Sequence, residues 1–237
     1  MNKFSTKAFT LAEVMIVVAI LGAVAVMVMP NLKNNTSEDT YIPTLKAAYG
    51  QLEAAISSVI SDYSSIQDAK SASTDCGSSN EDTCLDNLIA NKLDLQLNCE
   101  TSNLSRCYSS EKLKYIDGNN ASSGASYARC GYAFILSNGV AICHISDTTH
   151  DYETYEIDVN GPKKGPNVLG IDVFRTYLDV NDDFSYDSNP EGVNARKNGA
   201  DFRKNRDETA WAMTFGNMEY VKCGADLKWN IKTTCDN

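Results

Sequence analysis

Oxygen-bearing side chains and turn-forming residues are concentrated in one stretch, DVNGPKKGPNVLGID, which runs from Asp158 to Asp172. A short Asp-x-Asn-Gly loop lets a carboxylate, an amide oxygen and backbone carbonyl groups gather, and Ca²⁺ prefers such oxygen ligands. We therefore regard Asp158, Asn160 and Asp172 as candidate calcium ligands. The alternative is a turn of Asn, Gly and Pro residues that positions the edge of a sheet and holds no ion.

The eight cysteines all lie beyond position 75 and form no CxxC pair. The chain has only two histidines, His144 and His150, so a zinc site has few ligands to draw on. Disulfide bonds are the better interpretation, and they persist in oxidising compartments. Cys76 and Cys84 are a candidate pair because they are close in sequence. The cysteines therefore predict a part of the chain that lies outside the cytoplasm.

Motifs that would indicate catalysis or nucleic-acid binding are absent from the sequence. There is no Gly-x-Ser-x-Gly elbow, no His-Glu-x-x-His and no Gly-rich phosphate loop. His144 lies on an expected strand, where a structural role is commoner. The chain has 31 acidic and 21 basic residues, a balance that repels a phosphate backbone. We expect no enzyme, no required cofactor and no nucleic-acid partner.

The N-terminal segment has the properties of a membrane anchor. Residues 1–8 carry two lysines and no acid, and every residue from Val14 to Met29 is apolar or glycine. About twenty residues separate Phe9 from Pro30, roughly the 30 Å that a helix needs to cross a bilayer core. The run ends without a small-x-small site, which argues against an ordinary signal peptide. Glu13 lies inside the run, where a charge costs on the order of 2.5–3.5 kcal/mol, so it needs a function.

The stretch Lys7-Ala-Phe-Thr-Leu-Ala-Glu-Val14 resembles the prepilin signature of type IV pilins and type II secretion pseudopilins, in which a short basic leader precedes Phe-Thr-Leu-x-Glu. The resemblance implies cleavage between Ala8 and Phe9 by a membrane-embedded prepilin peptidase, followed by N-methylation of Phe9. Ala8 replaces the Gly that is usual before the cut. The family has a glutamate five residues into the mature chain and a proline that kinks the helix. These two residues correspond to Glu13 and Pro30.

This resemblance implies a pilin-like subunit of a type II secretion pseudopilus or type IV pilus, with other subunits and an inner-membrane assembly platform as partners. It also implies a single-pass protein of the bacterial inner membrane with its head in the periplasm or outside the cell. Glu13 would align each subunit against the Phe9 amine of the next, or it would instead reach the lipid headgroups. In this family a calcium loop resembling 158–172 is common, and a disulfide closing the C-terminal loop implies the pair Cys223 and Cys235.

The resemblance and the hydrophobic pattern together predict an α+β, pilin-like fold. Apolar residues recur at three- and four-residue steps and define one face of an amphipathic helix; they are Leu45, Tyr49, Leu52, Ile56, Val59, Ile60, Tyr63 and Ile66. A kink or a loosened turn, in place of one straight helix, is expected at residues 34–37 and at Pro43. The expected segments are a leader at 1–8, a transmembrane and assembly helix at 9–30, its amphipathic continuation at 31–68, and a head at 69–237.

Two hairpins and one short helix are expected in the head. Asn138-Gly139 suits a type I′ turn between the strands of the first hairpin, residues 130–145. Gly216-Asn217 would be the turn of the second, residues 209–221, and the helix would span 83–92. In the first hairpin a two-residue turn places Cys130 and Cys143 about four residues apart along the ladder, so we expect them to bond elsewhere.

Two other functions compete with a filament subunit. A membrane-anchored extracytoplasmic binding protein or adhesin could share the leader, and its anchor would be indifferent to Glu13. An anchored hydrolase would lose its activity when one acid of the head is changed.

Overall fold

The computed structural model describes residues 11–78, 80–145, 152–179, 184–185 and 208–236. The chain divides into two compact units, Met1–Thr40 and Tyr41–Asn237, which are described separately below. Of the predicted processing residues, Ala8 and Phe9 lie outside the described part of the chain.

Helix α1, Leu11–Tyr63, begins in the first unit. Near its start Val14, Met15, Ile16, Val17 and Val18 are each more than half exposed. Within the described residues, no helix meets the length and hydropathy needed to cross a membrane.

The kink or loosened turn expected at residues 34–37 and at Pro43 does not end the helix, because α1 continues through both positions. Proline removes one backbone hydrogen bond from a helix. Ile42 and Leu45, on either side of Pro43, are buried in the core of the second unit. Their packing supports the helix across the lost bond, as tertiary contacts commonly do.

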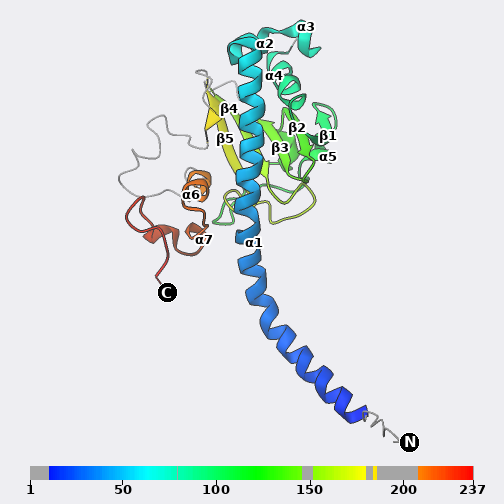
Figure 1. Cartoon of the computed structure of the whole chain (residues 1–237), viewed down its shortest axis with the longest axis vertical. Coiled ribbons are helices and arrows are strands. Elements are labelled where there is room, and N and C mark those ends of the chain that lie inside the picture. The colour runs from blue at the N-terminus through cyan, green and yellow to red at the C-terminus, as the bar shows by residue number, and fades with distance from the viewer. Residues whose placement is uncertain (1–10, 79, 146–151, 180–183, 186–207, 237) are drawn as a thin grey trace, which may run out of the picture. The chain divides into compact units, whose positions relative to one another are not determined.

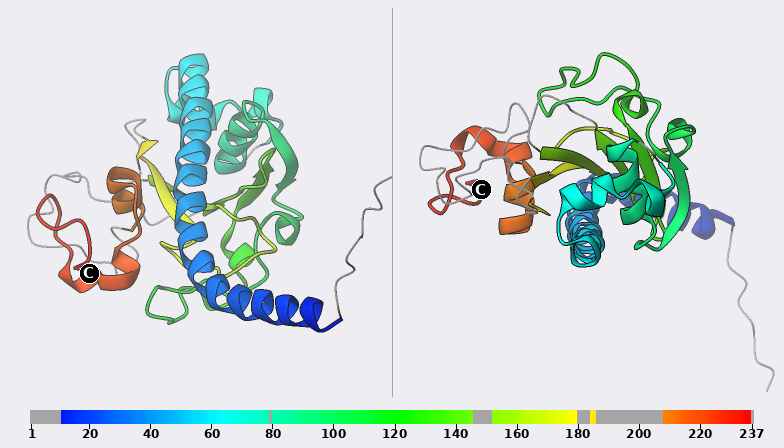
Figure 2. Two further views of the ribbon diagram at one scale, coloured as in Figure 1. Left: turned by 60° about the horizontal axis from the view of Figure 1, so that its bottom comes forward. Right: turned by 90° about the horizontal axis from the view of Figure 1, so that it is seen from above.

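The second unit is built on an antiparallel sheet whose strands follow one another in chain order (Figure 1). Its strands are β1 Leu95–Glu100, β2 Tyr132–Leu136, β3 Ala141–Ile145, β4 Tyr152–Asp158, β5 Val173–Asp179 and the two-residue β6 Phe184–Ser185. Seen from above, the part of α1 that belongs to the second unit, residues 41–63, lies along one side of this sheet (Figure 2). The chain is therefore an α+β protein with an antiparallel sheet, as predicted.

Short helices occupy the connections between these strands and the C-terminal part of the chain. They are α2 Ile66–Ser71, α3 Ser73–Cys76, α4 Glu81–Ala90, α5 Leu104–Cys107, α6 Glu208–Phe215 and α7 Tyr220–Cys223, with 3-10 turns η1 Ser126–Arg129 and η3 Gly224–Asp226. The helix expected at 83–92 corresponds to α4.

The main core lies between α1, α4 and one face of the sheet. From α1 the core takes the apolar positions that the helical period predicts, among them Leu45, Leu52 and Ile56. Facing them are Phe134, Ile142 and other alternate residues of the strands. A smaller core on the opposite face contains two disulfides, Cys99–Cys107 and Cys130–Cys143.

The exclusion of a Cys130–Cys143 bond is wrong: their sulfurs are bonded, with Cα atoms 5.4 Å apart. The hairpin register differs from the expected one, because Ile135 pairs with Ala141. The N–H of Leu136 then donates to the Val140 carbonyl at 2.9 Å, which leaves a loop of three residues, 137–139. More importantly, Cys130 is not part of the ladder. It follows directly after the 3-10 turn η1, and β2 begins only at Tyr132. The distance argument assumed an extended strand at Cys130, and that assumption fails.

The second expected hairpin is also wrong, because residues 208–215 form helix α6 and not a strand. Gly216 ends this helix with φ +67°, and its N–H donates to the Ala212 carbonyl at 3.0 Å. Glycine is the preferred residue for such a left-handed helix end. Asn217 then accepts from the indole N–H of Trp211 at 2.9 Å, which fixes the chain after the helix. Gly216-Asn217 is thus a helix end.

Candidate functional site

The N-terminal residues of functional interest lie in the first unit. Glu13 is in the first turn of α1, and Pro30 is within the same helix. Acidic side chains near a helix N-terminus are favoured by the positive end of the helix dipole.

The loop between β4 and β5 contains the predicted calcium ligands, and Asp172 organises it. One oxygen of Asp172 accepts from the backbone N–H of Asn167 at 2.8 Å and from the side-chain amide of Asn160 at 3.1 Å. Its other oxygen accepts from the N–H of Val168 at 2.7 Å. Burial raises the pKa of Asp172, and these hydrogen bonds oppose the rise. Asp172 is thus the anchor of the loop.

Asp158 is the last residue of β4 and is fully buried. Its Oδ1 accepts from the N–H of Gly161 at 3.0 Å and of Asn160 at 3.3 Å. Burial, followed by the charge of Asp172, raises the pKa of Asp158 to about 7. Gly161 has φ +87°, and a Cβ there would be 2.8 Å from the carbonyl oxygen of Gly139. Only glycine allows the loop to approach the β2–β3 turn this closely.

Three oxygens of this loop are buried and accept no hydrogen bond from the described residues: Asp158 Oδ2, Asn160 Oδ1 and Asn167 Oδ1. The orientation of Asn160 is well defined, because its Nδ2 faces the Gly165 carbonyl, Asp172 Oδ2 and the Tyr41 hydroxyl. Buried acceptors without donors are costly. One carboxylate and two amide oxygens are a donor set of the kind that Ca²⁺ takes. The chemistry of these oxygens is therefore that of a calcium ligand set.

The structure brings the predicted residues Asp158, Asn160 and Asp172 into one hydrogen-bonded loop, and it adds Asn167. Asn167 is nearly fully buried, has φ +56°, and directs its Nδ2 to Glu111 Oε2 at 3.4 Å. The sequence carries a signal for it, since Asn is among the few residues that tolerate a positive φ, and it follows a Gly-Pro pair. We define these four residues as the β4–β5 loop site.

A second polar cluster, not found from the sequence, surrounds His144 on β3. Its Nδ1 lies 2.6 Å from Asp86 Oδ2 of α4, and its Nε2 lies 2.8 Å from Glu153 Oε2 of β4. Burial alone lowers the pKa of His144, but the charge of Asp86 and the hydrogen bonds to both carboxylates raise it to about 10. Glu153 also pairs with Lys70 of α2. The expected structural role of His144 is thus that of a buried cation.

A third cluster lies on the other face of the sheet around Glu156 of β4, which is fully buried. Its Oε1 contacts Arg175 of β5 at 2.8 Å and Arg129 of η1 at 3.0 Å. Burial raises the pKa of the neighbouring Tyr108 hydroxyl well above its ordinary value, and the charge of Glu156 adds to the rise. Two arginines compensate the charge of this one carboxylate, so this cluster ties η1 and β5 to β4.

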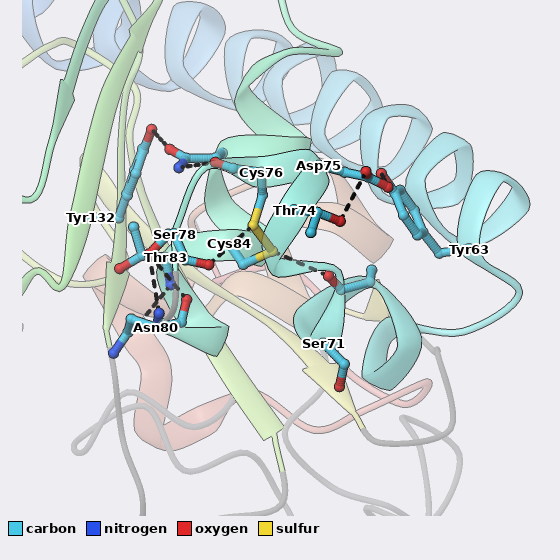
Figure 3. Close-up of a disulfide and its surroundings, with 12 residues drawn as sticks. Tyr63, Ser71, Thr74, Asp75, Cys76, Ser78, Asn80, Thr83, Cys84 and Tyr132 are labelled. Atoms are coloured by element: carbon cyan, nitrogen blue, oxygen red, sulfur yellow. Dashed lines mark hydrogen bonds between the residues drawn. A yellow bond between two sulfur atoms is a disulfide. The ribbon is translucent and has the colours of Figure 1, made fainter.

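Four disulfides connect the eight cysteines. Cys76–Cys84 and Cys223–Cys235 are the two pairs expected from the sequence. Figure 3 shows the first, which joins the end of α3 to α4, with the side chains of Asn80, Thr83 and Ser78 beside it. In the described residues the only gathering of potential His, Cys, Asp and Glu metal ligands is Glu219, Cys223 and Cys235. Its two sulfurs are bonded to each other, so they are not thiolate ligands.

Comparison with known proteins bears on the N-terminus. Residues 3–29 match the family described as the prokaryotic N-terminal methylation motif, which is the leader of type IV pilins and pseudopilins. The chain carries a prepilin-type leader. The match spans the predicted cleavage position, Glu13 and the whole apolar run from Val14 to Met29, and it supports a protein of the pilin family. No curated protein and no solved structure matches the chain.

Proposed function

We propose that this protein is a structural subunit that assembles through α1 into a type II secretion pseudopilus or a type IV pilus-like filament, and that it has no catalytic role. The observation that carries the proposal is the placement of Glu13. It lies within the matched leader motif, in the first turn of a helix whose next residues, Val14 to Val18, are apolar and exposed. Such a surface calls for a hydrophobic environment, either lipid or the helices of neighbouring subunits.

Processing and assembly follow from the leader. A prepilin peptidase would cut between Ala8 and Phe9 and leave an N-methylated Phe9 amine. In the membrane the carboxylate of Glu13 is costly, but an ammonium group from the neighbouring subunit compensates most of that cost. The segment 9–30 would span the inner membrane before assembly, delivered to an inner-membrane platform, with the head outside the cytoplasm. The four disulfides support an oxidising location for the head.

The architecture of the second unit supports a pilin-like fold. The α1 residues beyond Tyr41 pack on one face of an antiparallel sheet, and Leu45, Leu52 and Ile56 are buried there. One helix would then serve two roles, since its first part is the assembly segment and its later part is the support of the head.

Processing is tested by intact mass and N-terminal sequencing of the protein from membranes of a host with a prepilin peptidase. We expect a chain that begins at N-methylated Phe9. A matched sample from a peptidase-deficient host should keep residues 1–8. A chain that is cut beyond Met29, or left uncut in both hosts, contradicts the proposal.

Assembly is tested by the substitution Glu13→Ala. We expect loss of sheared or cross-linked filaments while the variant stays in the membrane fraction. Glu53→Ala is the matched control, because Glu53 is an exposed residue of the same helix within the second unit. Full assembly of the Glu13 variant would instead favour a membrane-anchored binding protein that shares the leader.

We also propose that the β4–β5 loop site binds calcium. Asp158, Asn160 and Asn167 would supply the oxygens that lack donors, and Asp172 would hold the loop and contribute charge. The ion would neutralise two buried carboxylates. Isothermal titration of the full chain in detergent should show Ca²⁺ binding with a Kd of about 10⁻⁴ to 10⁻³ M, typical of extracellular modules.

The calcium proposal has a matched pair of variants. Asp158→Asn should weaken Ca²⁺ binding at least about tenfold, because it removes the charge at the ligand. Asp117→Asn should leave it unchanged, because Asp117 is an exposed residue that bonds Asn119. Absence of Ca²⁺ binding to the unaltered chain would mean that water satisfies these oxygens, and it would leave the filament proposal intact.

A further inference from the structure

Helices α2 and α4 are attached to the sheet by a closed series of charged side chains. The segment Ile66–Ala90, which we name the cap, contains both helices and the Cys76–Cys84 bond. The series runs from Asp86 to His144, Glu153, Lys70 and Asp82, so that negative and positive groups alternate. Because Asp82 and Asp86 are one turn apart on α4, the series starts and ends on the same helix.

The two contacts of His144 define its protonation. Each ring nitrogen lies within 2.8 Å of a carboxylate oxygen, Asp86 Oδ2 on one side and Glu153 Oε2 on the other. An ionised carboxylate only accepts hydrogen bonds, so both ring nitrogens must donate, and only the imidazolium form has two N–H groups. His144 and Asp86 are essentially inaccessible to solvent. A neutral His144 would leave one buried carboxylate without its donor.

Within the described residues, two tyrosines of the neighbouring strands also face His144. Tyr155 of β4 stacks on the imidazole at 4.8 Å between ring centroids, and its hydroxyl donates to Asp86 Oδ1 at 3.3 Å. Tyr132 is opposite His144 in the ladder, and its hydroxyl donates to Asn87 of α4 at 2.8 Å. Burial raises the pKa of Tyr132 to about 12 and that of Tyr155 well above 10. Both tyrosines therefore stay neutral while His144 titrates.

We propose that this series is a proton-dependent clamp, in which protonated His144 docks the cap on the sheet and loss of that proton releases the cap. The proton on His144 is thus the ligand that controls whether the cap is docked on the sheet. Removing it leaves Asp86 and Glu153 on either side of a neutral ring, and a buried charge that loses its partner is strongly destabilising. The apolar residues Leu85, Leu88 and Ile89 would be exposed by the release.

The protonation state is tested by NMR of the full chain in detergent micelles with ¹³C-labelled histidine. The sequence has only two histidines, and the variant His150→Gln assigns the signals. We expect His144 to keep the imidazolium chemical shift from pH 5 to pH 8. A His144 signal that is neutral at pH 7, or that titrates with a midpoint below pH 7, overturns the proposal. This measurement leaves every residue of the cluster unchanged. It therefore tests the protonation of His144 even if a variant of the cluster fails to fold.

Release of the cap is tested by hydrogen exchange at pH 7 and above pH 10, corrected for the intrinsic rate. Peptides from α4 should lose protection at least tenfold more than peptides from residues 45–59 of α1. Asp86→Asn should lower the pH at which this occurs, while Asp62→Asn, which breaks an exposed pair with Lys92, should not. Equal loss of protection in α1 and α4 would indicate unfolding of the whole head and would refute the clamp.

Discussion

The wrongly excluded disulfide leads to a prediction with a matched control. Cys130–Cys143 and Cys223–Cys235 have sequence separations of 13 and 12, so their loops restrict the unfolded chain almost equally. Loops of this length correspond to about 3 kcal/mol of stability from chain entropy. The two bonds differ in burial, because Cys130 and Cys143 are nearly inaccessible whereas Cys223 and Cys235 are half-buried.

Burial makes the first bond the more costly one to remove. Replacing both of its cysteines by alanine leaves space in the small core and removes roughly 1 kcal/mol of burial for each sulfur, by comparison with a buried methylene. The double variant of Cys130 and Cys143 should therefore lose about 5 kcal/mol, and that of Cys223 and Cys235 about 3 kcal/mol. Urea unfolding of the full chain in non-reducing detergent buffer measures both. Equal losses, or a larger loss for Cys223 and Cys235, would refute the reasoning.

Further predictions concern the core, the loop and the clamp. Leu85→Ala should lower the free energy of unfolding in urea by about 2–5 kcal/mol, because Leu85 is fully buried. Gly170→Ala should destabilise the fold by more than about 1 kcal/mol, since φ is +81° and the new Cβ would be 2.6 Å from Glu208 Cγ. Gly50→Ala should instead stabilise the fold by about 0.5–1 kcal/mol, because Gly50 is on α1 and faces open space. The pKa of His144 is raised to about 10 from 6.5, so the stability it contributes should be complete below pH 6.5 and be lost as the pH rises through 10, and His144→Gln should flatten that dependence of the urea midpoint.

The parts of the fold that were predictable depend on local periodicity. The apolar stripe of α1 repeats over five turns, and a signal of that length identifies both the helix and its buried face. The short segment Ala-Trp-Ala-Met-Thr-Phe of α6 has no such repetition, and its aromatic residues favour a strand equally well. Packing of Trp211 on Phe215 and Trp229 decides for the helix. The contact between Trp211 and Trp229 joins residues that are far apart in the sequence, and no local pattern connects them.

The candidate calcium site was predictable in its composition but not in its roles. Asp158, Asn160 and Asp172 are close in sequence, and turn formers between them guarantee that they meet. Backbone N–H groups determine which oxygens are left without a hydrogen-bond donor. The direction of these N–H groups is set only when the loop is folded. The oxygens of Asp172 accept hydrogen bonds from Asn167, Val168 and Asn160. Part of the ligand role expected of Asp172 is therefore assigned to Asn167.

The clamp shows which sequence signal would have been useful. Asp86 lies in Cys-Leu-Asp-Asn-Leu-Ile-Ala, where all residues but Asp86 and Asn87 are apolar. Acidic residues are almost never fully buried without a partner. A buried aspartate therefore requires a cation on another element. His144 lies on a strand of apolar residues, so it too is buried and too polar to be left alone. Each residue by itself indicates a structural role. When two elements pack together and each has a polar residue at a core position, however, those two residues are expected to contact each other. The pair Asp86 and His144 could have been proposed on that ground, and the surrounding charges of Glu153 and Lys70 follow because a single buried pair leaves ring and carboxylate groups unsatisfied.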